Sequence, residues 1–477
     1  MTKRNYATVN PCVMCQPMGS ALAFKGIENT MVLYHGSQGC STYMRLHLSH
    51  HFREPVEIAS SSLNEKEAVY GGTENLKKGL KNVIKRYNPK VIGVATTCLT
   101  ETIGDDVPAI IKEFKEEEGI GDDPEKDIII IPVSTPSYGE SHVSGYIKAL
   151  DAVVRKFSEK SGEEEFLKIP NGKLNLIPVE SFSPADVREI KEILEFMAGD
   201  YIFLPDISDT FDAPLREKLP KIAVGGTPLS EIADMPNSRA SIGLGVVSTN
   251  LAVKYLEDYH GVPGHNVPIP IGLLNTDLFF TELVRTLGCP IPDKYQNERG
   301  RLLDAMVDVH KYLYGVKAAV YGDPDSVFSL TTFMLELGMN PVLVSTGSKN
   351  RDFEKRIKQI FEEIRPELEP VVLDGIDFDT LNDAVSECGP EILIGNSKGR
   401  YIAKARDIPL VRVGLPIHDR VGAQRILTVG YRGALELLDR ITNTILEATD
   451  TFTAPVQVEP AAYAGEGAKD ERVEGSR

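Results

Sequence analysis

The sequence is short of basic clusters, of cysteine and of long apolar runs, and these shortages exclude several classes of protein. Its 477 residues carry a net charge of −17, and no run of Lys or Arg exceeds two residues. Because a nucleic-acid-binding face needs clustered basic side chains, we expect no nucleic acid partner. No stretch approaches the roughly 20 apolar residues of a membrane span, and residues 1–7 lack the apolar segment of an export signal. We therefore expect a cytoplasmic chain that makes no membrane contact.

The chain also lacks the patterns of three common cofactor or redox sites. No G-x-x-x-x-G-K-[ST] segment is present, so we expect no ATP hydrolysis by this chain itself. Cys12 and Cys15 form a C-x2-C pair, but no second pair follows at the spacing of a zinc site. No apolar strand precedes the pair, as one would in a thioredoxin-like motif. Six cysteines in so long a chain do not indicate a disulfide framework, and Cys289 and Cys388 are typical of small buried hydrophobic residues.

What the chain does contain is a repeated alternation of short apolar strands with amphipathic helices. Residues 91–95 and 127–132 are apolar, rich in β-branched side chains and bounded by turn residues, as in buried parallel strands. Ser183 and Pro184 predict a helix start, with serine as the cap and proline in the first turn. The alternation and the length predict an α/β fold of three Rossmann-like domains with parallel sheets flanked by helices. The expected domains are residues 1–160, 161–297 and 298–450, followed by a tail at 451–477 that we expect to be disordered.

Three cysteines, Cys15, Cys40 and Cys98, each lie where a strand or turn ends and glycine or small residues leave room for a ligand. Cys98 follows an apolar run, which places it at the carboxyl end of a parallel strand, where such sheets bind ligands. Thiolates from loops far apart in sequence are compatible with an iron–sulfur cluster, but three thiols leave a cubane one ligand short. The simplest completion is a second chain, which would put the cluster at a subunit interface, and Cys12 or a serine oxygen are the alternatives.

The histidines near these cysteines can be explained without metal ligation. His35 is interpreted as a turn residue that donates to a backbone carbonyl rather than as a metal ligand. His47, His50 and His51 form either a solvated face or part of the surroundings of a cluster. Residues 395–399 are basic and flanked by glycine, and we interpret them as an ordinary turn after a strand, with anion contact as the alternative.

Several motifs that contain or follow these cysteines are typical of one known family. They are Cys15–Gly19, His35–Cys40, His51–Pro55, Val69–Gly72, Thr96–Cys98, Glu101–Asp106, Thr135–Ser137, Glu298–Gly300, Tyr321–Asp325, Gly395–Gly399 and Val413–Arg420. In these motifs the chain resembles the nitrogenase component 1 superfamily, on its β-like side. The resemblance runs from Asn10 to about Glu447.

The resemblance implies an iron–sulfur cluster at the interface with an α-like subunit, of E or D type, in an α2β2-like heterotetramer. Cys15, Cys40 and Cys98 are then this chain's metal ligands, and Ser137 matches a serine beside the larger cluster of catalytic subunits. The implied cluster is either of the 4Fe–4S type or P-cluster-like. The implied electron donor is the ATP-dependent iron protein, which docks over the interface.

Four segments, 21–24, 58–63, 133–137 and 417–426, resemble one member of the superfamily in particular. That member is the N subunit of the scaffold on which the iron–molybdenum cofactor of nitrogenase is matured. We therefore expect a scaffold subunit with no catalytic residue of its own and with the cofactor precursor on the partner chain. The alternative is the catalytic β subunit of nitrogenase or of a nitrogenase-like reductase, since all three cysteines and Ser137 are present.

Overall fold

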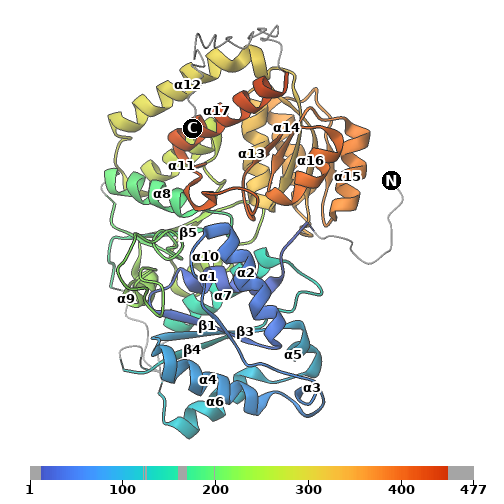
Figure 1. Cartoon of the computed structure of the whole chain (residues 1–477). Coiled ribbons are helices and arrows are strands. Elements are labelled where there is room, and N and C mark those ends of the chain that lie inside the picture. The colour runs from blue at the N-terminus through green and yellow to red at the C-terminus, as the bar shows by residue number, and fades with distance from the viewer. Residues whose placement is uncertain (1–11, 122, 124–125, 159–168, 198, 450–477) are drawn as a thin grey trace, which may run out of the picture.

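The chain folds around three separate sheets, and every strand pairing within them is parallel. The first sheet lies at the bottom of Figure 1 and the third at the top right. This confirms the α/β class with helix-flanked parallel sheets that the sequence predicts. The computed structural model describes residues 12–121, 123, 126–158, 169–197 and 199–449, so the tail expected at 451–477 lies outside the described residues. Within these ranges no helix is both long enough and apolar enough to cross a membrane.

The first sheet is buried on both faces because successive side chains of a strand point to opposite sides. In β1, Met31 and Leu33 pack in the cluster that includes helices α4 and α6, whereas Val32 and Tyr34 pack in the cluster that includes α1 and α7. This double burial explains why its strands read as continuous apolar runs. In spatial order the strands are β2 (Ile58–Ser60), β1 (Thr30–His35), β3 (Val91–Thr96) and β4 (Ile129–Val133), and the helices are α1 (Gln16–Lys25), α4 (Thr73–Tyr87), α6 (Val107–Glu118) and α7 (His142–Ser158).

A helix that flanks the second sheet begins where Ser183 and Pro184 predict a helix start. Ser183 accepts a hydrogen bond from the Asp186 N–H at 3.0 Å, and the Asp186 carboxylate accepts from the Ser183 N–H at 3.0 Å, which closes a capping box. Helix α8 therefore begins at Pro184, as predicted. In spatial order the strands are β6 (Tyr201–Phe203), β5 (Leu174–Pro178), β7 (Ala240–Leu244) and β8 (Gly264–Val267), and the helices are α8 (Pro184–Phe196), α9 (Leu229–Asp234), α10 (Leu251–His260) and α11 (Gly272–Leu287).

The third sheet is the widest of the three. Helix α12 (Asp293–Leu313) leads into it and spans residue 298, at which the third domain is expected to begin. The division of the chain into domains at 160/161 and 297/298 stays a prediction. The strands in spatial order are β11 (Val371–Leu373), β10 (Asn340–Thr346), β9 (Lys317–Gly322), β12 (Ile392–Gly395) and β13 (Leu410–Arg412), and the helices are α13 (Pro324–Glu336), α14 (Phe353–Ile364), α15 (Phe378–Cys388), α16 (Arg400–Arg406) and α17 (Gly430–Thr449).

In each sheet the chain adds strands first on one side of the starting strand and then on the other side, which creates a topological switch point. These switch points lie between β1 and β3, between β5 and β7, and between β9 and β12. In open parallel sheets the connections diverge at such a point, and the crevice beyond the carboxyl ends of the two strands is where ligands bind. The fold therefore has three such crevices. The residues that follow β1, β3, β5 and β9 are the first candidates for a ligand-binding site.

Candidate functional site

The three cysteines predicted as ligands lie at the carboxyl edge of the first sheet. Cys40 is in the first turn of α2 (Gln38–Phe52), which follows β1, and Cys98 is the first residue of α5 (Cys98–Ile103), which follows β3. Cys15 immediately precedes α1, whose first residue is Gln16. Because β1 and β3 are neighbours at the switch point of the sheet, the helices that carry two of the thiols diverge from one crevice.

Ser137, in the loop after β4, connects two of these cysteines. Its backbone N–H donates to the Cys98 sulfur at 3.2 Å, and its hydroxyl oxygen accepts from the Gln16 N–H at 2.9 Å. Partial desolvation by the surrounding protein atoms raises the pKa of the Cys15 thiol. A hydrogen bond with Ser137 opposes that rise, and the neighbouring Cys98 and Cys40 thiols raise the pKa further. The structure therefore brings all four predicted residues into one electrostatically coupled group.

The group is open on one side, and several large apolar side chains are exposed on the elements beside it. Cys15 is exposed, and Cys40 and Cys98 are half-buried. Thiolate sulfurs are soft ligands that suit iron–sulfur clusters, and three of them with one hydroxyl are too few to enclose a cluster completely. Large apolar side chains are exposed on α2, on α3 (Glu67–Tyr70), which packs against α5, and directly after Ser137: Tyr43, Leu46, Val69, Tyr70 and Tyr138. An exposed apolar patch around an incomplete site is typical of a surface that a second chain covers.

Cys12 does not belong to this group. Its side chain is buried in the apolar cluster of the third sheet, together with Tyr321, and burial raises the pKa of its thiol to about 12. Because its side chain is packed among the apolar residues of the third sheet rather than at the edge of the first sheet, the structure argues against Cys12 as the fourth ligand. Lys398, from the turn after β12, donates to the carbonyl oxygen of Val13 at 3.4 Å, and its charge lowers the pKa of Cys15. Residues 395–399 are thus more than an ordinary turn, because they place a positive charge beside the cysteine segment.

His35 is a structural residue, not a metal ligand. Its Nδ1 lies 2.9 Å from the Ser61 hydroxyl oxygen and its Nε2 lies 3.0 Å from an Asp105 carboxylate oxygen. Burial lowers the pKa of His35, although the charge of Asp105 opposes this. Ser61 and Asp105 therefore occupy both ring nitrogens, which leaves none for a metal. The hydrogen-bond partners are side chains rather than the backbone carbonyl that the sequence analysis expected.

The histidines of α2 hold the loop after β13 in place. The ring of His51 accepts the Ile417 N–H at 2.8 Å, and burial lowers the pKa of His51 to about 3. The ring of His47 stacks on that of His418 with centroids 5.2 Å apart, and the ring of His50 lies edge-on to His418 at 6.0 Å. These side chains connect the first sheet with the third. They therefore do not form a wholly solvated face, which was one of the two interpretations of the sequence.

Behind the cysteine segment lies a buried cluster that the sequence analysis missed. His142 begins α7, Glu180 follows β5 and Asp323 follows β9, and their nitrogen and oxygen atoms lie within 4.8 Å of one another. The Met14 N–H points to Nδ1 of His142 at 3.4 Å, which leaves the ring proton on Nε2, 3.2 Å from Asp323 Oδ1. A protonated Nε2 has no lone pair for a metal ion. With that tautomer His142 offers no lone pair to a metal ion. The sequence did not reveal the cluster because its three residues meet only through tertiary contacts.

Glu180 is the member of this cluster with the clearest effect on stability. Burial raises its pKa well above the usual range, and the charge of Asp323 raises it further. A carboxyl group with a raised folded-state pKa contributes stability that is complete below its unfolded pKa of about 4.3 and is lost as pH rises toward the folded value. In Glu180→Gln the side chain keeps its shape, and an amide N–H replaces the carboxyl O–H as donor. Glutamine does not ionise, so the variant does not lose stability as pH rises. We expect it to stabilise the protein at neutral pH by about 1–3 kcal/mol.

Thermal unfolding of wild type and Glu180→Gln between about pH 5 and 8 measures this difference, which should widen as pH rises. Glu140→Gln is the control, because Glu140 is half-exposed and its pKa is lowered, chiefly by a hydrogen bond from Lys148. We expect Glu140→Gln to change the unfolding midpoint little. A lower midpoint for Glu180→Gln at every pH would contradict a protonated Glu180.

Comparisons with known proteins agree with this arrangement. Residues 15–446 match the family described as "Nitrogenase component 1 type Oxidoreductase". The chain is 43% identical to a nitrogenase molybdenum-iron protein beta chain of Methanococcus maripaludis, over 93% of this chain and 96% of that protein. It is 39% identical to the protein of the same name from Clostridium pasteurianum, over 94% and 95% of the two chains. One chain of the solved structure of nitrogenase Cp1 at pH 6.5 superposes with a TM-score of 0.89 at 38% identity, over 95% of this chain and 97% of that one.

These relatives overturn one expectation from the sequence. The prediction of an N subunit of the cofactor-assembly scaffold is wrong, because the similar chains, at 37–43% identity, are named as molybdenum-iron protein beta chains. The physical reason is visible in the segment 417–426 that favoured the scaffold. Its first residues serve packing: the Ile417 N–H bonds to His51, the His418 ring stacks on His47, and Asp419 pairs with Arg412 at 2.8 Å. Such contacts secure the fold and do not distinguish one function from another.

Proposed function

This chain belongs to the nitrogenase component 1 type oxidoreductase family, and on that premise we propose that it is the β-type subunit of a catalytic nitrogenase. The observation that carries the proposal is its similarity, over nearly the whole chain, to proteins named nitrogenase molybdenum-iron protein beta chain. The crevice at the first switch point supports it, since Cys15, Cys40, Cys98 and Ser137 gather there.

We propose that these three cysteines ligate an iron–sulfur cluster shared with a partner chain and that Ser137 lies beside it. The donor set fits such a group: three thiols lie at one open edge, and a backbone N–H already points to one sulfur. A cluster bound there would accept and release single electrons. The amino-terminal ends of α1 and α2 carry partial positive charge, which favours thiolates and an anionic cluster. The Ser137 N–H stabilises negative charge on the Cys98 sulfur, and Lys398 does the same electrostatically for Cys15.

We propose further that an α-type subunit supplies the remaining ligands, in an α2β2 heterotetramer served by the ATP-dependent iron protein. The exposed apolar side chains around the site, with Tyr70 81% and Tyr138 69% exposed, support a covering partner. In this proposal the partner carries the iron–molybdenum cofactor of a working nitrogenase. A cofactor precursor was expected only for an assembly scaffold, and the proposal does not include one.

The activity of the assembled complex tests this proposal. We expect the chain, purified with its α-type partner and mixed with reduced iron protein and ATP, to support sustained reduction of acetylene to ethylene. The same mixture without iron protein is the control and should show none, because electrons then have no route to the site. A complex with a full iron complement that reduces neither acetylene nor dinitrogen would refute the catalytic assignment.

A further inference from the structure

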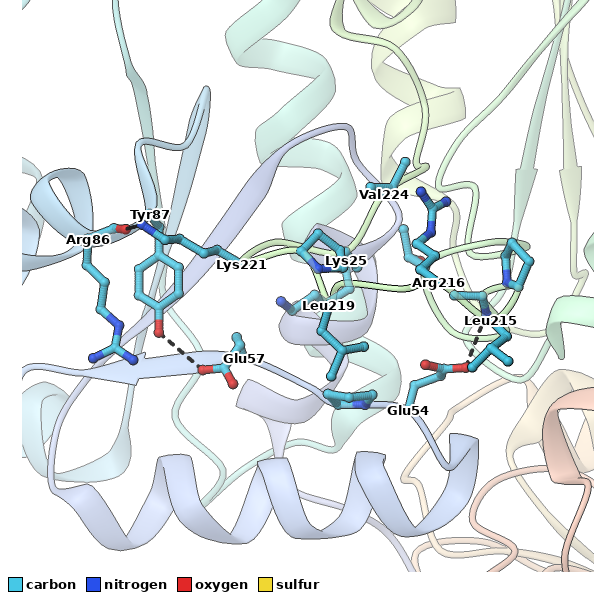
Figure 2. Close-up of a pocket in the computed structure, with 16 residues that line it drawn as sticks. Lys25, Glu54, Glu57, Arg86, Tyr87, Leu215, Arg216, Leu219, Lys221 and Val224 are labelled. Atoms are coloured by element: carbon cyan, nitrogen blue, oxygen red, sulfur yellow. Dashed lines mark hydrogen bonds between the residues drawn. The ribbon is translucent and has the colours of Figure 1, made fainter.

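A cavity of about 380 Å³ lies between the first sheet's helices and a loop that returns from the second sheet. In Figure 2 the loop residues Leu215 and Leu219 lie on the side of Glu54 and Glu57, which come from the segment after α2, and Val224 lies farther from these two carboxylates. The volume lies within the range of about 300–1,000 Å³ that is usual for small-molecule sites. None of the residues assigned above to the cysteine group lines this cavity, so it is a separate site.

Lys25, the last residue of α1, is the most buried charged side chain of the cavity wall. It is only 5% exposed, and burial lowers its pKa to about 8, although the charge of Glu57 opposes this and that of Arg45 adds to it. Among the described residues its ammonium group has no hydrogen-bond partner and no carboxylate oxygen within 4.0 Å. Burying a cationic group without a counter-ion is costly. The cavity therefore presents an amine that lacks an anionic partner from the protein.

The rest of the wall favours an anion with an apolar body. Three further basic side chains line the cavity, those of Arg86, Arg216 and Lys221, against two carboxylates, those of Glu54 and Glu57. The carboxylates have partners already: Glu54 accepts the Ala213 N–H at 3.2 Å, and Glu57 accepts the Tyr87 hydroxyl at 3.2 Å.

In a chain of net charge −17 this is a local positive excess, which attracts anions. The two carboxylates would still repel a dianion more strongly than a monoanion. Leu215 and Leu219 are 103% and 77% exposed, so an apolar ligand body would gain by covering them.

We propose that this cavity binds a small organic monocarboxylate, with the carboxylate group paired to Lys25 and the hydrocarbon part against Leu215, Leu219 and Val224. The inference does not rest on the proposed function, because it concerns binding at a wall that shares no residue with the cysteine group. Lys25 and Leu219 both line the cavity, and Figure 2 draws both near the middle of the view, so the wall offers a charged and an apolar side chain to one ligand.

Calorimetric titration of the intact complex with hexanoate tests the proposal without turnover. We expect saturable binding, and weaker or no binding of hexanamide, which lacks the charge, and of acetate, which lacks the apolar body. Near pH 8 about half of the Lys25 amines are neutral, and pairing with a carboxylate raises the amine's pKa, so binding should take up a fraction of a proton. That uptake appears as a binding enthalpy that differs between phosphate and Tris buffers.

Two matched lysine variants identify the residue responsible. Lys25→Met should weaken hexanoate binding by at least about tenfold and abolish the proton uptake. Lys221→Met should change affinity by no more than about twofold, because the Lys221 amine is already hydrogen-bonded to the Arg86 carbonyl oxygen at 2.9 Å. Methionine at position 25 removes an unpaired buried amine, so folding should not suffer. No hexanoate binding by the complex, equal binding of hexanamide, or equal losses in both variants would overturn the proposal.

Discussion

Replacing Cys40 with alanine is expected to remove most of the iron from the complex and to weaken the association of the chain with its α-type partner. Cys40 is one of three thiols in the group and sits in the first turn of α2, held there by the helix rather than by a loop. Loss of even an outer-shell partner of a metal site costs about 10–100-fold in metal affinity, so loss of a ligand should cost at least that. Iron analysis of the purified complex and size-exclusion chromatography measure the two effects.

Cys388→Ala is the matched control for this experiment. Cys388 is also a half-buried free thiol, but it ends α15 and packs against the apolar cluster of the third sheet. We expect its replacement to leave iron content and assembly unchanged. Normal iron content in Cys40→Ala would refute the ligand assignment, and so would an equal loss of iron in both variants.

The elements predicted from the sequence are those whose signals are local. The apolar run 91–95 became β3, and the Ser183–Pro184 cap became the start of α8. A strand buried on both faces is apolar throughout, and a cap depends on residues three apart, so neither needs knowledge of the rest of the chain.

The elements that were not predicted are set by tertiary contacts. Helix α1 is buried along its whole length, including Gln16 and Ser20, and a helix without a solvated face has no apolar periodicity to detect. Strand β8, Gly264–Val267, is short and polar at an edge of its sheet and owes its conformation to pairing with β7. In both cases the neighbours decide the structure, and they are far away in sequence.

The residues of the candidate site likewise fall into those that the sequence predicts and those that only tertiary contacts reveal. The cysteines could be named because each follows a strand or turn, and parallel sheets bind ligands at that edge. Glu180 and Asp323 follow strands of different sheets, and nothing in either sequence segment indicates that His142 lies between them. Lys25 lies in an apolar segment with no sequence signal of a site, and its cavity exists only because residues 210–224 fold back over it.

Replacing Gly19 with alanine is expected to be among the most damaging single changes to the fold. Helices α1 and α7 make the most extensive contact between any two elements, and their backbones touch. A Cβ atom at Gly19 would lie 1.7 Å from the carbonyl oxygen of His142, and one at Gly145 would lie 2.0 Å from that of Gln16. Backbone atoms cannot swing aside as the end of a flexible side chain can, so α1 must move off α7.

That movement would reach the site as well as the core. Cys15 immediately precedes α1, and His142 is the first residue of α7, so a shift of one helix against the other displaces both. We expect Gly19→Ala to destabilise the protein by about 3–5 kcal/mol, at the upper end for overpacking because both contacts are backbone. Iron content should fall together with stability. Urea unfolding and iron analysis of the same preparation measure the two effects.

Gly300→Ala is the control that separates close packing from the general effect of a glycine. Gly300 is exposed within α12, and a Cβ atom there would meet no atom within 4 Å. Alanine in a helix interior is favoured over glycine by about 1 kcal/mol, so this variant should be slightly more stable than wild type. Opposite signs for the same substitution would show that backbone contact between α1 and α7 is the cause. A wild-type unfolding midpoint in Gly19→Ala would mean that the two helices are not in contact there, and that Cys15 is held by its loop alone.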